Sequence, residues 1–297
     1  MSDLPPIELS GAVAVVTGGA GGIGRGIVGS LLRHGASVAI ADVEKTAIDA
    51  AVADLSPLGT VTGHQVDISD EDEVASLADA VYATYGQVDL LFNNAGVTSG
   101  GGGKPWQQEA NDWRWCFGVN VFGMASCVSA FVPRMIDGDR AGQVINTSSG
   151  DGGFAPVPMA SVYAASKAAV SCFTESLHYN LMSEETKLRA SVFYPSGGLL
   201  RTGLFTAYRN RPEHLARRGE GTGRRSMTFD EMKEMLAKGG RDTTEADLDE
   251  LGEFAVTGAA ARRFLIARDL DHTAALLHRR ADAIGNGDVP PHHGMPL

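Results

Sequence analysis

The sequence predicts an α/β protein built on a doubly wound parallel sheet of about seven strands, with helices on both faces. Short apolar, β-branched runs alternate with amphipathic runs along most of the chain, and the connections between them are short. A glycine-rich turn lies between the first apolar run and the first helix. Polar clusters follow several of the strands, at the edge where parallel sheets of this kind bind ligands.

Composition and charge restrict the class of protein. With 43% hydrophobic and 21% charged residues, the 297-residue chain has an ordinary globular composition. It contains no repeats and no linker rich in Pro, Gly or Ser, so we expect a single domain over 1–297. A net charge of -11 argues against nucleic-acid or anionic-membrane partners. We see no apolar run of about 20 residues and no leader pattern, and expect a cytoplasmic protein with no membrane partner.

The first β-α unit contains a candidate phosphate-binding turn. A buried strand from Ala12 to Thr17 leads into G-G-A-G-G-I-G, Gly18 to Gly24, and then into an amphipathic helix closed by Gly35. Glycines let the backbone approach a pyrophosphate, and the helix N-terminus presents free N–H groups to it. The spacing G-x-x-x-G-x-G differs from the usual dinucleotide fingerprint. Close packing between strand and helix is the alternative reading.

Asp42 ends the second strand, which begins at Ser37, and lies 18 residues beyond Gly24. At that offset a carboxylate can accept hydrogen bonds from an adenosine ribose and would repel a 2′-phosphate. The turn has Gly21 where a basic residue could bind such a phosphate, and Val43-Glu44 follow Asp42. NAD is therefore favoured over NADP. Capping of the helix that starts near Glu44 is an alternative role for Asp42 and does not exclude the first.

The remaining elements continue the alternation. A third strand from Val61 runs to Asp67-Ile68, a helix follows from Ser69 to about Gly86, and a fourth strand from Val88 leads into N-N-A-G, Asn93 to Gly96. Later strands are expected at Gly142 to Thr147, Arg189 to Tyr194 and Arg263 to Ala267. Helices are expected over Asn111 to Met135, Tyr163 to Met182, Glu245 to about Thr257 and Asp271 to Ile284.

Tyr163 and Lys167 are four residues apart and share one face of a predicted helix. A phenol has a pKa of about 10, and a nearby ammonium would lower the pKa of Tyr163 toward the range of a useful base. Ser149, at the end of the preceding strand, offers a neutral hydroxyl to a substrate oxygen. Y-x-x-x-K alone is a weak signal, and its context strengthens it.

These motifs together resemble the classical short-chain dehydrogenase/reductase family. Thr17-Gly18 with Gly22 and Gly24 is similar to its cofactor turn, and Asn93 to Gly96 to its N-N-A-G. The catalytic positions of the family are matched by Asn120, Ser149, Tyr163 and Lys167. The matches run from about Ala12 to Thr202. The resemblance implies a Rossmann-type fold and hydride transfer between a nicotinamide and an alcohol or ketone carbon.

The resemblance also implies a role for each matched residue. Tyr163 would exchange the alcohol proton, Ser149 would orient the oxygen, and Lys167 would also hold the nicotinamide ribose. Asn120 would position a water, with an ordinary satisfied helix amide as the alternative. The implied cofactor-binding residues are Gly18, Gly22, Ile23, Gly24, Asp42, Asp67, Ile68, Asn94, Ala95, Gly96, Tyr163, Lys167, Pro195, Leu200 and Thr202.

The chain departs from the family pattern in three places. Ser149 and Tyr163 are separated by 14 residues, one more than is common, because the loop from Gly150 is longer; we prefer Ser149 to Ser148 as the catalytic serine. Pro195-Ser196 stands where Pro-Gly is usual, so Leu200 and Thr202 are candidates for contacts to the cofactor carboxamide. The frequent ending V-D-G-G is missing.

Two loops are expected to form the substrate pocket. One runs from Val97 to Trp106, and the other starts at Leu199 and belongs to an extended substrate-binding lid at about 199–260. Pocket candidates are Trp106, Phe154, Met159, Phe205 and Tyr208, with Phe193 and Tyr194 beside them; ordinary core packing is the alternative for each. They favour an apolar or ring-containing secondary alcohol or ketone. An anionic substrate tail could meet Arg209, Arg211, Arg217, Arg218, Arg224 and Arg225, unless these form a solvated helix face.

Other features contribute less. Cys116, Cys127 and Cys172 are interpreted as buried reduced thiols. His292-His293 have no paired acidic or cysteine residues nearby in the sequence that could complete a metal site, so no metal is expected. A sugar or acyl-thioester dehydrogenase is an alternative function, as is a sensor that binds NAD(H) without turnover, although all four catalytic candidates are present. A homodimer or homotetramer is implied by the family, with the helices Asn111 to Met135 and Tyr163 to Met182 as contact surfaces.

Overall fold

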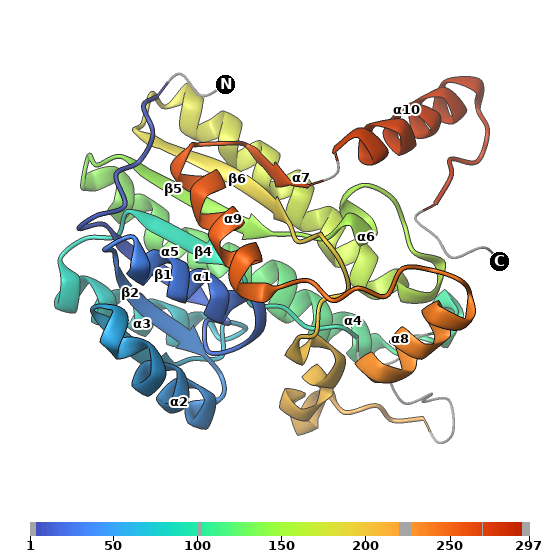
Figure 1. Ribbon diagram of the computed structural model, residues 1–297, viewed down its shortest axis with the longest axis horizontal. Coiled ribbons are helices and arrows are strands. Elements are labelled where there is room, and N and C mark those ends of the chain that lie inside the picture. Colours follow the sequence, from blue (N-terminus) through green and yellow to red (C-terminus); the bar gives the residue numbers. More distant parts are fainter. Residues whose placement is uncertain (1–3, 100–102, 220–226, 269, 293–297) are drawn as a thin grey trace.

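The sheet has seven parallel strands in the order β3-β2-β1-β4-β5-β6-β7 (Figure 1). The computed structural model describes residues 4–99, 103–219, 227–268 and 270–292. The strands are β1 Val13–Thr17, β2 Ser37–Asp42, β3 Val61–Gln65, β4 Leu90–Asn93, β5 Gly142–Thr147, β6 Leu188–Tyr194 and β7 Leu265–Ala267. The order reverses between β1 and β4, where a doubly wound sheet opens its ligand crevice. The predicted fold class is confirmed.

Helices cover both faces of the sheet (Figure 1). The helices are α1 Gly22–Arg33, α2 Lys45–Leu55, α3 Glu71–Tyr85, α4 Ala110–Phe117, α5 Met124–Asp137, α6 Gly150–Gly153, α7 Ser161–Ser183, α8 Phe229–Lys238, α9 Leu248–Ala260 and α10 Leu270–Asn286. Side chains of β1 alternate between two cores: Ala14 and Val16 pack with α1, α2 and α9, and Val15 packs with α3, α5 and α7. Burial on both faces explains why the strands read as continuous apolar runs.

Helices α1 and α9 cross at two glycines, which lets their backbones touch. A Cβ atom on Gly26 would lie 2.2 Å from the carbonyl oxygen of Leu248, and one on Gly252 would lie 2.2 Å from the carbonyl carbon of Gly26. Leu251, Ala255, Val256 and Ala259 of α9 are fully buried in the same core. This packing brings the C-terminal part of the chain against the helix that follows the glycine turn.

The structure refines several predicted elements. The single helix expected over Asn111 to Met135 consists of α4, a π-helical segment Gly118–Gly123, and α5. Helix α8 was not predicted as a separate element, and α10 stands apart from the two layers in Figure 1. Within the described residues, the combined helix Ala110–Asp137 alone has the length and apolar composition of a membrane-crossing helix, and half of its most apolar stretch is buried, as in a core helix.

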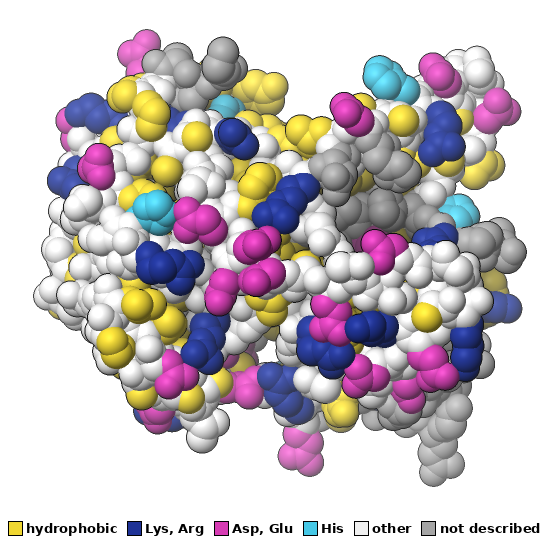
Figure 2. Space-filling view, in the orientation of Figure 1, with side chains coloured by type: hydrophobic (Ala, Val, Ile, Leu, Met, Phe, Trp, Pro, Cys, Tyr) yellow, Lys and Arg dark blue, Asp and Glu magenta, His cyan; other side chains and the backbone are white. Residues whose placement is uncertain are grey.

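The structure tests the expectation that the three cysteines are buried reduced thiols. Cys116 and Cys127 are buried free thiols, but Cys172 on α7 is exposed, so the prediction that it is buried is wrong. Burial raises the pKa of Cys116 to about 11 and that of Cys127 to about 12, which keeps both protonated. On the face shown in Figure 2, acidic and basic side chains intermingle. His293 lies outside the described residues.

Candidate active site

A cavity of about 480 Å³ lies at the carboxyl ends of β1, β2, β4, β5 and β6. Parallel strands bring these ends to one edge, so residues far apart in the sequence meet there. The predicted site residues on its wall are Gly18, Gly22, Ile23, Asp42, Asp67, Ile68, Asn94, Ala95, Gly96, Ser149, Tyr163, Lys167, Pro195, Leu200, Thr202 and Phe205. Cofactor and catalytic candidates thus share one cavity.

The glycine turn connects β1 to α1 and touches the loop after β4. Gly18 has φ +63°, a left-handed conformation that suits glycine, and a Cβ there would lie 2.9 Å from the Cα of Ala95. The Thr17 hydroxyl accepts from the backbone N–H groups of Asn94 at 3.0 Å and Ala95 at 3.1 Å. Gly24 lies behind the turn rather than on the cavity wall, since its Cβ would be 2.0 Å from the Gly18 carbonyl oxygen.

Asp42 is held by backbone donors on both sides. One carboxylate oxygen accepts from the Ala20 N–H and the other from the Glu44 N–H, each at 3.2 Å. Burial raises the pKa of Asp42, and these backbone hydrogen bonds oppose that effect only in part. Helix α2 begins at Lys45 with Glu44 in the cap position, so Asp42 stabilises the turn before the helix rather than capping it. Its carboxylate therefore remains on the cavity wall.

Ser149, Tyr163 and Lys167 meet where β5 ends and α7 begins. The Ser149 side chain lies beside the Tyr163 phenol, close enough to lower the pKa of that phenol. The Lys167 ammonium lies 5.8 Å from the centre of the Tyr163 ring and donates to the Thr147 carbonyl oxygen at 2.8 Å. The four-residue helical spacing and the strand end therefore bring the three predicted catalytic side chains together.

The pKa values of this cluster differ from the sequence-based expectation. Burial raises the pKa of Tyr163, the Ser149 side chain opposes that rise, and nearby Asp151 adds to it. Burial also lowers the pKa of Lys167 to about 8. The expectation of a lowered pKa at Tyr163 is therefore wrong for this geometry, because burial disfavours the phenolate and outweighs a nearby ammonium, which bonds to the backbone of Thr147.

The two adjacent serines have different surroundings. Ser148 is 2% exposed, and its hydroxyl bonds the Lys167 carbonyl oxygen and the Ser171 hydroxyl, both at 2.8 Å. Ser149 caps the short turn α6 by accepting from the Asp151 N–H at 3.2 Å and reaches Tyr163. Ser149 is thus the serine beside the phenol, as the sequence analysis preferred.

Asn120 lies in the π-helical segment and is buried behind the cavity rather than on its wall. Its amide oxygen accepts from the Val97 N–H at 2.8 Å, and its amide nitrogen donates to the Val97 carbonyl at 2.9 Å and the Ser166 hydroxyl at 2.9 Å. A Cβ on Gly96 would lie 3.3 Å from both Asn120 Oδ1 and Lys167 Nζ. In this geometry Asn120 fixes the loop after β4, which agrees with the satisfied-amide alternative.

Comparison with known proteins decides the family. The model for short chain dehydrogenases matches residues 12–212. The chain belongs to the short-chain dehydrogenase/reductase family.

Two relatives and one solved structure resemble this chain. A C alpha-dehydrogenase from Sphingobium sp. is 38% identical over 203 residues, which are 67% of this chain and 64% of the relative. A fluoren-9-ol dehydrogenase from Terrabacter sp. is 36% identical, over 56% of this chain and 51% of the relative. A Burkholderia phymatum short chain dehydrogenase/reductase in complex with NAD superposes with a TM-score of 0.86 at 33% identity, covering 98% of this chain and 100% of that one.

The structure brings only some of the aromatic and apolar pocket candidates together. Phe205 lines the cavity, whereas Trp106, Met159 and Tyr208 are 78%, 53% and 52% exposed and do not line it. Phe154 stacks on Tyr194 with ring centroids 4.1 Å apart, and Phe193 is fully buried in the core. Lining residues that the sequence analysis missed include Trp115, Val119, Leu204, Ala207 and Met232. Trp115 and Val119 share a helix face just before Asn120, a spacing that could have indicated them.

Four of the arginines that were candidates for an anionic tail instead bind the protein's own carboxylates. They lie in residues 199–219, the first part of the expected lid, which we call the lid segment. Arg209 pairs with Glu44, while Arg211 and Arg217 both pair with Asp112. Arg218 contributes its backbone N–H to Glu109. Arg224 and Arg225 lie outside the described residues.

Proposed function

We propose that the protein is an NAD-dependent dehydrogenase that transfers a hydride between the nicotinamide and a secondary alcohol or ketone. The observation that carries this proposal is that Ser149, Tyr163 and Lys167 lie together on the wall of the same cavity as the glycine turn and Asp42. A proton-exchanging phenol and a dinucleotide site in one cavity are what alcohol oxidation coupled to a nicotinamide requires.

The residues present fit a dinucleotide. Gly21, at the N-cap of α1, makes no side-chain cap bond, and a Cβ on it would meet nothing within 4 Å. The turn and the α1 N–H groups would hold the pyrophosphate, Asp42 the adenosine ribose, Asp67 and Ile68 the adenine side, and Lys167 the nicotinamide ribose. Thr147 Oγ1 on the cavity wall is buried without a partner among the described residues, which suits a polar ligand. When bound, NAD⁺ supplies the hydride acceptor and a positively charged ring.

The protein's own groups would manage the proton. As the phenolate, Tyr163 Oη takes the alcohol proton during oxidation; as the phenol, it donates a proton to the ketone during reduction, while the Ser149 hydroxyl holds the substrate oxygen. A raised pKa at Tyr163 keeps the phenol protonated in the resting protein, ready to donate to a ketone. Lys167 in its charged form favours the phenolate. Asn120 would fix the loop that contains Val97. We also propose that Asn120 positions a water.

Asp42 supports NAD rather than NADP. Its carboxylate is fixed by two backbone donors at the end of β2, and a 2′-phosphate there would face a negative charge. Glu44 adds a second carboxylate nearby. The solved relative from Burkholderia phymatum is in complex with NAD, which agrees with this preference.

An apolar, ring-containing alcohol suits the cavity, because apolar side chains contribute to its wall. These include Trp115, Val119, Leu204, Phe205 and Met232. One relative is described as acting on fluoren-9-ol, a ring-containing secondary alcohol, and we propose the same class here. The apolar lining disfavours a sugar or an acyl thioester, and an intact Ser149, Tyr163 and Lys167 disfavour a non-catalytic sensor.

A screen of secondary alcohols with NAD⁺ and NADP⁺ tests this function, using the near-ultraviolet absorbance of the reduced cofactor. We expect turnover of aromatic or polycyclic alcohols with NAD⁺, little with NADP⁺, and a Tyr163→Phe variant that binds NAD⁺ but is inactive. Better turnover with NADP⁺ would show that Asp42 has been misread. Tight NAD⁺ binding without turnover of any alcohol, ketone, sugar or thioester would favour the sensor.

We also propose a homodimer or homotetramer. Trp113, Phe122 and Ile136 on the α4–α5 helices, and Tyr179 and Met182 on α7, are exposed apolar side chains on the two long helices expected to form contacts. Light scattering of wild type and of Phe122→Glu tests this: a smaller mass for the variant supports the interface, and a monomeric wild type rejects it.

A further inference from the structure

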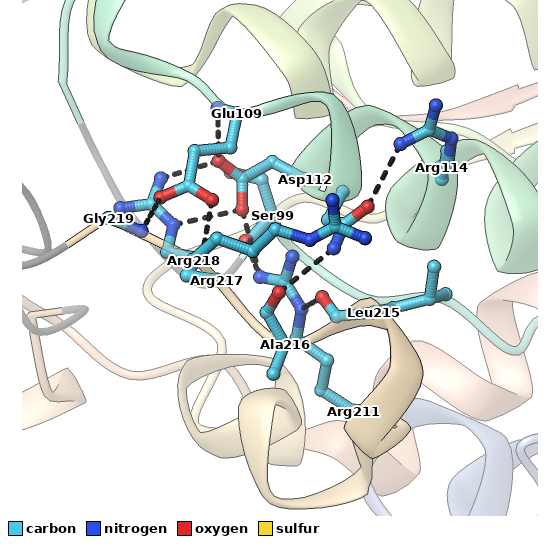
Figure 3. Close-up of polar contacts among 11 residues, drawn as sticks. Ser99, Glu109, Asp112, Arg114, Arg211, Leu215, Ala216, Arg217, Arg218 and Gly219 are labelled. Atoms are coloured by element: carbon cyan, nitrogen blue, oxygen red, sulfur yellow. Dashed lines mark hydrogen bonds and ion pairs between the residues drawn. The ribbon is translucent and has the colours of Figure 1, made fainter.

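Asp112, in the first turn of α4, is a fully buried carboxylate gripped by two arginines of the lid segment (Figure 3). One carboxylate oxygen accepts from Arg211 Nη1 at 2.8 Å and Arg217 Nε at 2.9 Å. The other accepts from Arg217 Nη2 at 2.6 Å and from the Glu109 N–H at 2.8 Å. Residues about 100 positions apart in the chain are therefore joined at one carboxylate.

The cluster is well matched in charge and in hydrogen bonds. A buried carboxylate alone would be costly, and two guanidiniums with one backbone donor compensate that cost. Although burial raises the pKa of Asp112, the hydrogen bonds from Arg217, the Glu109 backbone and Arg211 outweigh it and lower the pKa overall. Asp112 is thus ionised at neutral pH, and removal of either partner would leave a buried charge poorly paired.

Arg211 extends the cluster to the wall of the cavity. Its Nη1 also donates to the Ser99 carbonyl oxygen at 3.2 Å, and its Nε donates to the Leu215 carbonyl oxygen at 2.7 Å. Its guanidinium lies 5.2 Å from the ring centre of Trp115, which lines the cavity. Ser99 follows Val97, the residue that Asn120 fixes. Arg211 therefore links the loop after β4, the cavity wall of α4 and the lid segment.

Neighbours of Asp112 add further bonds to the lid segment (Figure 3). Asn111 Nδ2 donates to the Ala216 carbonyl oxygen at 2.9 Å. The Glu109 carboxylate accepts from the backbone N–H groups of Arg218 at 2.7 Å and Gly219 at 3.2 Å. The start of α4 thus holds residues 211–219. The helical turn Gly203–Asn210, which comes directly before them, supplies Leu204, Phe205, Ala207, Arg209 and Asn210 to the cavity wall.

We infer that Asp112 is a positioning residue that fastens the lid segment, through Arg211 and Arg217, over the cavity. It touches neither substrate nor cofactor and acts through Phe205 and its neighbours, whose place depends on residues 211–217. This inference rests on the proposed function for its kinetic consequence, a lower KM for the alcohol. The fastening itself is independent of that function.

Asp112→Asn tests the fastening, because both carboxylate oxygens of Asp112 accept from N–H donors. In the variant one of these oxygens is replaced by an amide NH₂, which cannot accept a hydrogen bond from them. Asp79→Asn is the matched control: Asp79 also pairs with an arginine, Arg134, but is 79% exposed and lies on α3. Four quantities are measured for wild type and both variants. They are the rate of trypsin cleavage after Arg217, identified by mass spectrometry, the Kd for NAD⁺, and the KM and kcat for an alcohol substrate.

We expect Asp112→Asn to raise the cleavage rate and the KM by about tenfold, with kcat within about threefold and the Kd within about twofold of wild type. Asp79→Asn should change none of them. Unchanged cleavage or an unchanged KM overturns the inference, as does a parallel loss of kcat, NAD⁺ binding and thermal stability, which would show a purely structural role.

Two arms keep the test decisive. If Asp112→Asn does not fold, Arg217→Ala replaces it, and its effect is measured by the KM and by the rate of trypsin cleavage after Arg218. Arg217→Lys retains the charge but not the paired hydrogen bonds, so its KM should lie between those of wild type and Arg217→Ala. If no alcohol is turned over, the proposed function fails while the cleavage rate still decides whether Asp112 fastens the lid segment.

Discussion

Lys167 Nζ donates a hydrogen bond to the Thr147 carbonyl oxygen at 2.8 Å, although Lys167 is only 4% exposed. Lys167 is therefore a buried cation. Burial lowers its pKa from 10.5 to about 8, and no carboxylate contributes to that shift. Burying the Lys167 ammonium lowers the stability of the folded protein. The protein nevertheless retains this cation at the site where we propose the chemistry to occur.

Lys167→Met should stabilise the protein at neutral pH while abolishing activity. Lowering the pKa to about 8 corresponds to roughly 3 kcal/mol against the charged form, and the lost hydrogen bond offsets about 1 kcal/mol, so we expect a gain of about 2 kcal/mol at pH 7. Between about pH 8 and 10.5 the unfolded chain binds more protons than the folded one, so wild-type stability rises and the gain shrinks.

Urea unfolding at pH 7 and pH 10 measures this difference. Lys45→Met is the control, since Lys45 is 59% exposed and its removal should change stability little at either pH. A Lys167→Met protein that is less stable than wild type at pH 7 would contradict the burial argument.

Ser149→Ala and Ser148→Ala should fail in different ways. Loss of the Ser149 hydroxyl removes the group beside the Tyr163 oxygen, so kcat should fall about 100-fold with normal thermal stability. Loss of the Ser148 hydroxyl breaks buried bonds to Lys167 and Ser171 and should cost about 1–2 kcal/mol of stability. Equal kcat losses in the two variants would argue against Ser149 as the substrate-facing serine.

Gly24→Ala should disrupt the cofactor turn. Its Cβ would lie 2.0 Å from the Gly18 carbonyl oxygen and 2.7 Å from Asn94 Nδ2, so the turn must shift, and we expect a loss of at least about 2 kcal/mol in unfolding free energy. Gly21→Ala is the control: its Cβ meets nothing within 4 Å and its φ is -152°, so stability should stay within about 1 kcal/mol of wild type. Similar losses would rule out close approach as the reason for Gly24.

Glu44→Gln should speed cofactor release. Glu44 accepts from Asn210 Nδ2 at 2.8 Å and pairs with Arg209, joining the lid segment to the end of β2 beside Asp42. We expect the dissociation rate of NADH to rise about three- to tenfold, measured by stopped-flow fluorescence. Burial alone would raise the pKa of Glu44, but Asn210 and Arg209 lower it below 4.5. The contact of Glu44 with Arg209 and Asn210 is therefore complete above pH 4.5 and is lost as the pH falls below it. An NADH dissociation rate that does not change in Glu44→Gln would refute this role.

The sheet and the cofactor turn were predictable because each rests on a local pattern. A buried parallel strand needs a continuous apolar run, and the close approach of Gly18, Gly24 and Asn94 needs glycine, so the sequence from Ala12 to Gly24 carries both signals. Tyr163 and Lys167 were predictable because a helix fixes residues four apart on one face.

The lid segment was not predictable in the same way. Arg211 and Arg217 read as surface or substrate-binding cations, and only the fold brings Asp112 to them from about 100 residues away. Trp106 and Met159 are aromatic or apolar residues near the site in sequence, yet their loops lead them to the surface. The pKa of Tyr163 was also misjudged, because spacing shows the neighbour Lys167 but not the burial that dominates.

The most direct test of the account is the rate of NADH formation from NAD⁺ and a ring-containing secondary alcohol such as fluoren-9-ol, for wild type and Tyr163→Phe. We predict turnover by the wild type and a loss of at least about 1,000-fold in kcat for the variant, with NAD⁺ binding retained. A Tyr163→Phe protein that oxidises the alcohol at a rate near that of wild type would contradict the central claim that Tyr163 exchanges the substrate proton.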